Sequence, residues 1–88
     1  MNKKIIMNEF VKYFTTFPNH SYKQFHLYLT NNSFIPFGVS FTQTIDSIRK
    51  TLQNNKILQC SKKNDGNGYF YSEKKIDIQK YNSFINKA

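Results

Sequence analysis

Four polar side chains recur along one stretch of the chain at the spacing of a helix face. At intervals of four, three and four residues, they are Gln43, Ser47, Lys50 and Asn54. A helix would bring all four to one side, because residues three and four positions apart lie on the same face. Glutamine and asparagine can bond an adenine edge in bidentate fashion, lysine can reach guanine, and serine is adaptable. The stripe therefore indicates a surface that reads base edges. The alternative interpretation is the solvated side of an ordinary amphipathic helix.

Two further groups of residues are suited to binding phosphates. Thr42 and Arg49 fall on one flank of the same helix, and Lys74 and Lys75 add positive charge further along the chain. In the segment between Arg49 and Lys74, we expect four residues to contact the DNA backbone: Lys62, Lys63, Asn64 and Asn67. A flexible basic tip suits the DNA backbone or the minor groove, where charge counts and shape need not be exact. Lysines on edge strands also prevent edge-to-edge pairing, and this alternative stays open.

The net charge favours an anionic partner. Thirteen lysine and arginine residues stand against five aspartate and glutamate residues, which gives a formal charge of +8 on 88 residues. Such an excess most often indicates nucleic acid. The chain is also rich in lysine, asparagine, isoleucine and phenylalanine, as in the translation of AT-rich DNA. That bias raises the lysine content without selection for binding, and it also suggests a mobile element.

Residues able to carry catalysis or to hold a metal are sparse. His20 and His26 are six positions apart, which is the wrong spacing for two ligands on one helix turn. Cys60 lies in a strand-like segment, where a small buried apolar residue is expected. Gly66 and Gly68 fall in a turn between strands and not before a helix, so they form no phosphate-cradling loop. We therefore expect no enzyme, no cofactor and no metal.

The length and the cysteine usage predict one domain in a reducing compartment. Residues 1–88 are enough for a single domain, and one cysteine cannot form an internal disulfide framework. The start MNKKIIMNEF has no sustained apolar run, and nothing approaches the roughly 18 apolar residues of a membrane span. We expect a soluble intracellular protein in the cytoplasm, nucleoid-associated if bacterial, with no membrane contact.

Apolar spacing predicts the helices that must position these side chains. Stripes at intervals of three and four indicate helices at 3–16, 21–31 and 41–54. Pro18 closes the first, and Asn19 or Ser21 can cap the second. A Ser-x-x-Gln capping box starting at residue 40 opens the third. The third helix should end in asparagines 54 and 55, because asparagine is a poor helix former that tolerates left-handed geometry.

A hairpin and a last helix complete the predicted elements. The segments KILQCSKK and YFYSEK flank NDGNG, in which Asp65-Gly66 or Asn67-Gly68 can form a tight turn. Two candidate turns leave the register open, and with it the faces of residues 69–71. Apolar residues at positions 78–85 then predict a short C-terminal helix, which either packs on the first helix or offers a dimer face.

The order helix, helix, helix, hairpin, helix resembles a winged helix-turn-helix domain. The strongest local match is IRKTLQNNKILQCSKKNDGNGYFY, residues 48–71, and the resemblance covers about residues 5–75. It implies a mainly α fold with a β-hairpin (α+β): three helices, a basic wing and a short C-terminal helix. It also implies that helix 41–54 enters the major groove while the hairpin 62–74 contacts the backbone. The segment between the second and third helices is longer than such a domain usually has.

These observations together predict a non-enzymatic protein that binds double-stranded DNA. We expect a small regulator of transcription or replication, and a homodimer through the first or the last helix would strengthen binding. Two alternatives stay open. One is a protein-binding winged-helix adaptor or inhibitor. The other is an RNA-binding module in which Tyr69 and Tyr71 stack on unpaired bases.

Overall fold

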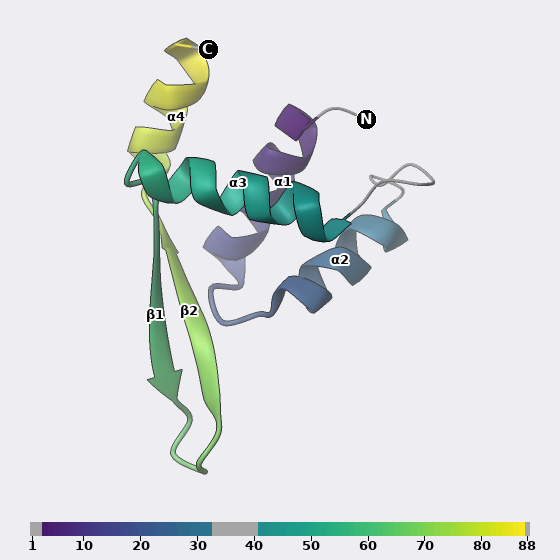
Figure 1. Ribbon diagram of the computed structural model, residues 1–88, viewed down its shortest axis with the longest axis vertical. Coiled ribbons are helices and arrows are strands. Elements are labelled where there is room, and N and C mark those ends of the chain that lie inside the picture. The colour runs from purple at the N-terminus through teal and green to yellow at the C-terminus, as the bar shows by residue number, and fades with distance from the viewer. Residues whose placement is uncertain (1–2, 33–40, 88) are drawn as a thin grey trace.

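Four helices and one β-hairpin make up the described part of the chain. The computed structural model describes residues 3–32 and 41–87. In chain order the elements are α1 (Lys3–Thr16), α2 (Tyr22–Asn31), α3 (Phe41–Asn54), β1 (Leu58–Asn64), β2 (Phe70–Ile76) and α4 (Ile78–Lys87). The predicted order of elements is confirmed, and so is the mixed α+β class. In Figure 1, α3 crosses in front of α1, the hairpin projects away from the helices, and α4 lies at the end opposite the hairpin tip.

Local hydrogen bonds define where α2 and α4 begin. Ser21 is the N-cap of α2, and its side chain forms a reciprocal capping box with Gln24. Of the two predicted caps, Ser21 is therefore the one used and Asn19 is not. The carboxylate of Asp77 accepts a 3.0 Å bond from the amide of Lys80 and so caps α4 through a single side-chain bond. The capping box predicted from Ser40 lies outside the described residues.

A left-handed lysine follows the end of α3 at Asn54. Lys56 adopts φ 58°, in the left-handed region that an L-residue seldom visits. The amide of Ile57 donates to the carbonyl of Leu52 at 2.9 Å, and that of Lys56 donates to Gln53 at 3.0 Å. These two bonds form a Schellman motif, which turns the chain directly into β1. The predicted end of the helix at Asn54 is confirmed, and the left-handed position is taken by Lys56 two residues later.

Aromatic side chains fill the core between the helices. The rings of Phe10 and Phe25 meet edge to face with centroids 5.6 Å apart, and Phe14 packs against both. The side chains with no exposed surface come from α1, α2 and α3: Phe10, Phe14, Phe25, Leu29, Ile48 and Leu52. From α4, Tyr81 is buried and its hydroxyl donates to Asn8 of α1. The interpretation of the C-terminal helix as part of the core is thus confirmed for Tyr81.

The strands of the hairpin pair antiparallel with a fixed register. Leu58 lies opposite Ile76 at the base of the hairpin, and Asn64 lies opposite Phe70 near the tip. The loop between the strands is residues 65–69, so neither of the two predicted two-residue turns forms. Gly66 and Gly68 both adopt φ 89°, a conformation that glycine takes readily. Both glycines therefore serve the same five-residue loop.

Candidate nucleic-acid interface

The polar stripe predicted on the third helix is largely exposed. Gln43, Lys50 and Asn54 all face solvent on α3. The opposite side of the helix packs into the core through Ile45, Ile48 and Leu52. The separation follows from the helical period, since the polar and apolar sets each recur at three and four residues. The outer side of α3 therefore presents two amides and an ammonium group to whatever approaches it.

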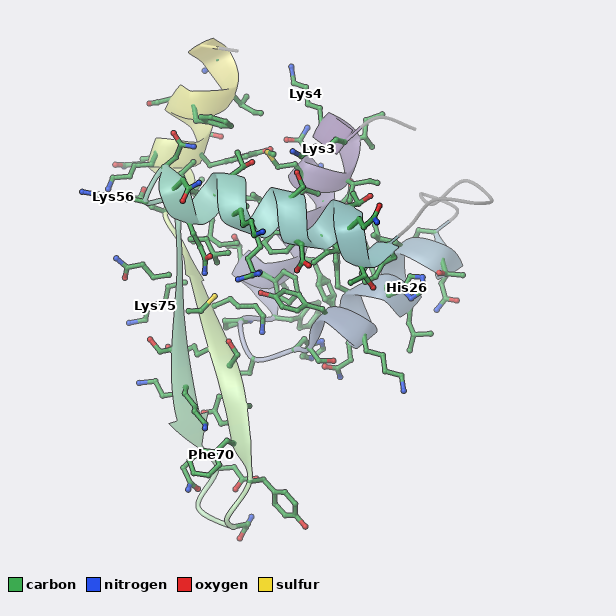
Figure 2. The ribbon with its side chains drawn as sticks, viewed as in Figure 1. Lys3, Lys4, His26, Lys56, Phe70 and Lys75 are labelled. Atoms are coloured by element: carbon green, nitrogen blue, oxygen red, sulfur yellow. The ribbon has the colours of Figure 1, made fainter. Side chains whose placement is uncertain are left out.

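Ser47, the fourth residue of this stripe, has a partner within the protein. Its hydroxyl accepts a 2.5 Å hydrogen bond from Nζ of Lys3 at the start of α1, and the residue is half-buried. Lys3 thus brings a positive charge to the edge of the stripe, as Figure 2 shows above α3. Sequence reasoning missed Lys3, because no local pattern links residues that are 44 positions apart.

The flank of α3 that was predicted to contact phosphates carries an internal ion pair. The guanidinium of Arg49 lies 3.5 Å from the carboxylate of Asp46, and its side chain is 33% exposed. A second nitrogen of the same group is 3.5 Å from the amide oxygen of Gln53. Thr42 lies exposed near the start of this flank. Arg49 is therefore held along the helix surface, with part of its charge balanced by Asp46.

This flank meets the hairpin at a corner lined by three elements. Nε2 of Gln53 lies 3.6 Å from the sulfur of Cys60 on β1. Tyr22 of α2 interacts with the same thiol from the third element. Burial, the nearby Cys60 thiol and Asp46 raise the pKa of Tyr22 to about 12, while Arg49 opposes the shift. Cys60 is exposed, so the prediction of a buried cysteine was wrong. Along β1 only the first residue is buried, because the rest of the strand extends past the core.

A buried lysine fixes the hairpin against the helices. Lys74 of β2 is 3% exposed, and its Nζ donates 2.9 Å bonds to the carbonyls of His20 and Ser72. The same ammonium group lies about 5 Å from the ring centroids of Phe14 and Tyr22. Burial lowers the pKa of Lys74 below its ordinary value, and the Cys60 thiol opposes that shift. Lys74 therefore does not belong to the basic surface to which the sequence analysis assigned it.

The register separates the predicted phosphate ligands of the hairpin. Residues directly opposite each other in a ladder share a face. Cys60 lies opposite Lys74 on the inner face, which meets the helices, and Lys62 follows two positions later on that same face. Lys63 falls on the outer face together with Lys75, which points away from the helices in Figure 2. One side of the hairpin thus presents Lys62 and the other presents Lys63.

The loop at the tip is held by its own acceptors. The side-chain oxygen of Asn64 accepts from the amide of Gly66 at 2.8 Å. A carboxylate oxygen of Asp65 accepts from the amides of Asn67 and Tyr69 at 2.7 and 3.3 Å. Asn64, predicted to contact the DNA backbone, therefore uses its acceptor to shape the loop. Asn67 is exposed at the tip.

The histidine, cysteine and acidic side chains of residues 3–32 and 41–87 are scattered over the fold. No group of three or more histidine, cysteine, aspartate or glutamate side chains gathers there to hold a metal ion. His20 is engaged with the hydroxyl of Tyr13 at 2.6 Å, and His26 stacks on Phe41. Within the same residues, none of the helices has the length and hydropathy to cross a bilayer. Comparison of the chain with protein-family models, curated proteins and solved structures found no match.

Proposed function

We propose that this protein binds double-stranded DNA without catalysing a reaction. In this proposal the domain is a winged helix-turn-helix, α3 lies in the major groove and the hairpin contacts the sugar–phosphate backbone. A small regulator of transcription or replication fits such an activity. The proposal rests on the exposed amide and ammonium groups of α3, which adjoin a basic hairpin that projects from the same corner.

The side chains on α3 suit the major groove. An α-helix fits that groove, where each base pair presents a distinct set of donors and acceptors. Gln43 and Asn54 can each bond an adenine edge twice, and Lys50 can donate to guanine. Their opposite face is anchored by buried Ile48 and Leu52, so α3 can present them without losing its own packing.

Positive charges around α3 supply the sequence-independent part of binding. Lys3 lies at the edge of the stripe through its bond to Ser47, and Lys62 lies on the inner hairpin face. Phosphate contacts of this kind fix the register of a protein on the duplex, while base contacts set the preference. A single small module binds weakly, so a homodimer through α1 or α4 would raise affinity on a palindromic site.

The rigid corner between α3 and the hairpin supports simultaneous contact. Lys74 and the Schellman turn at Lys56 hold the hairpin at one angle to the helix. Binding then requires little reordering of the protein, which lowers its entropic cost. A hairpin that swung freely would instead have to be ordered on every encounter.

Chemical-shift mapping tests this proposal. A ¹⁵N-labelled sample is titrated with a random-sequence duplex at low salt. We expect the largest amide shifts near Gln43 and Lys50 on α3 and around Lys62 on β1. Amides of α4 such as Gln79 should move little. Shifts confined to α4, or no shifts at all, would contradict the proposal.

A further inference from the structure

Two adjacent aromatic rings lie exposed at the far end of the hairpin. Tyr69 is 73% exposed and Phe70 is 62% exposed. The tip is well separated from the helices, as Figures 1 and 2 show, so neither ring packs into the core. In the same chain Phe10, Phe14 and Phe25 are 0% exposed. Burying a phenylalanine side chain contributes about 2 kcal/mol to folding, so the two tip rings forgo a stabilisation that the core rings receive.

The surroundings of these rings are positively charged. Nζ of Lys62 lies 4.6 Å from the centroid of Phe70, on the inner face of the hairpin. Lys63 is exposed next to it in the chain, on the outer face. The acidic residue of the loop, Asp65, already accepts hydrogen bonds from the amides of Asn67 and Tyr69. A ligand on the inner face of this tip therefore meets the ring of Phe70 and the ammonium group of Lys62 at the same place, with Lys63 on the other side of the hairpin.

Nucleic acid with unpaired bases has the matching chemistry. An unpaired base offers a flat π-face to an aromatic ring, and the adjoining phosphate offers a negative charge to a neighbouring ammonium group such as that of Lys62. A fully paired duplex keeps its bases stacked on each other and offers the tip phosphates but no free base face. The tip thus fits a different part of DNA from the one that suits α3.

We propose that the hairpin tip stacks Tyr69 and Phe70 on unpaired bases of DNA next to the duplex bound by α3. This inference rests on the proposed duplex binding for its second contact. A strand of seven residues spans roughly 23 Å at about 3.3 Å per residue. The tip therefore reaches bases well away from those under α3. The protein should prefer a duplex that contains an unpaired segment, as at a melted or junction site.

Three labelled probes test this preference by fluorescence anisotropy at one salt concentration. They are a paired duplex, the same duplex with a few mismatched central bases, and the corresponding single strand of DNA or RNA. The wild type should bind the mismatched duplex about tenfold more tightly than the paired one, because a stacked base contributes a factor of about 5 to 150. 2-Aminopurine in the mismatched segment should be quenched on binding.

Two double variants separate stacking from general hydrophobic contact. Both Tyr69→Ala with Phe70→Ala and Tyr69→Leu with Phe70→Leu should lose the preference and the quenching while they keep paired-duplex affinity. The rings are exposed, so circular dichroism should show an unchanged fold. Leucine variants that keep the preference would overturn the stacking claim. So would a wild type that binds both duplexes equally.

The probes also separate this proposal from the proposed duplex binding. If the paired duplex binds without any preference for the mismatched one, the tip proposal fails and duplex binding stands. If single strands bind through the rings but the paired duplex does not, duplex binding fails and so does the placement of the tip next to a duplex, while stacking on single strands stands, with DNA and RNA told apart by their affinities. Wild-type binding to phosphatidylserine vesicles that is lost in the alanine variant, with no quenching by DNA, would overturn the tip proposal in favour of a membrane surface.

Discussion

The ammonium group of Lys74 donates a 2.9 Å hydrogen bond to the carbonyl of His20, 54 positions earlier in the chain. The backbone amide of the same lysine donates to the carbonyl of Pro18 at 2.9 Å. Together these bonds tie β2 to the connection between α1 and α2. They set the angle at which the hairpin leaves the helices, and with it the corner between the hairpin and α3.

Replacing this lysine should destabilise the protein. Lys74→Met keeps an apolar stem but removes the buried ammonium group that donates to the carbonyls of His20 and Ser72. Losing a buried partner of this kind costs about 1–3 kcal/mol of unfolding free energy, measured by urea denaturation. The matched control is Lys75→Met, one residue later and exposed, which should change stability by less than about 0.5 kcal/mol. Equal effects from the two substitutions would contradict the anchoring role of Lys74.

Stability should fall in alkaline solution partly through Tyr22. The tyrosine pKa is raised from 10.0 to about 12 in the folded protein, chiefly by burial. Between these pH values the Tyr22 hydroxyl loses its proton in the unfolded chain but keeps it in the folded protein. The stabilisation that is present below pH 10 is therefore lost as the pH rises toward 12. Tyr22→Phe should flatten part of that decline in thermal melts recorded across the range. A variant whose stability declines with pH as steeply as that of the wild type would contradict this contribution of Tyr22.

Glycine should suit position 56 better than lysine. Lys56 holds φ 58°, where an L-residue is strained and glycine is not. Lys56→Gly should therefore stabilise the protein by up to about 1 kcal/mol, after allowing for the greater entropy of glycine in the unfolded chain. Lys56→Ala, which removes the same charge and keeps the strain, is the control. A glycine variant no more stable than the alanine variant would argue against the Schellman turn.

Base contacts and phosphate contacts should respond differently to single substitutions. Lys50→Ala should change which sequences are selected from a random duplex pool, since a good base contact discriminates by about 1–3 kcal/mol. Lys62→Ala should instead weaken all sequences alike and lower the salt slope by about one unit. Lys63→Ala, on the outer hairpin face, should lower it by less. Equal losses from Lys50→Ala and Lys62→Ala with no altered preference would remove the recognition role of α3.

Local patterns predicted the elements because each depends on residues close in the chain. The helix ends at Thr16 and Asn54 follow from apolar spacing, a proline and a run of asparagines. The loop was harder, because Asp65 bonds the amides of both Asn67 and Tyr69 and so stabilises a longer turn than a glycine pair suggests. The residues of α3 that face solvent also follow from the helical period.

Contacts between distant residues were beyond such reasoning. The burial of Lys74 depends on a carbonyl 54 positions away, and the engagement of Ser47 depends on Lys3. Whether Lys62 or Lys63 faces the helices depends on the register, which two possible turns left undecided. Cys60 is exposed because β1 leaves the core after its first residue, a fact about the length of the hairpin relative to the core.

Duplex binding through phosphate contacts is tested most directly by its dependence on salt. A random-sequence duplex is titrated with the wild-type protein, and the dissociation constant is followed by fluorescence anisotropy at several salt concentrations. We expect micromolar binding at low salt and a log-log slope of about −3 to −6, each unit being about one neutralised phosphate. No binding at low salt, or a slope near zero, would show that the charge of +8 reflects composition alone and would contradict the DNA-binding proposal.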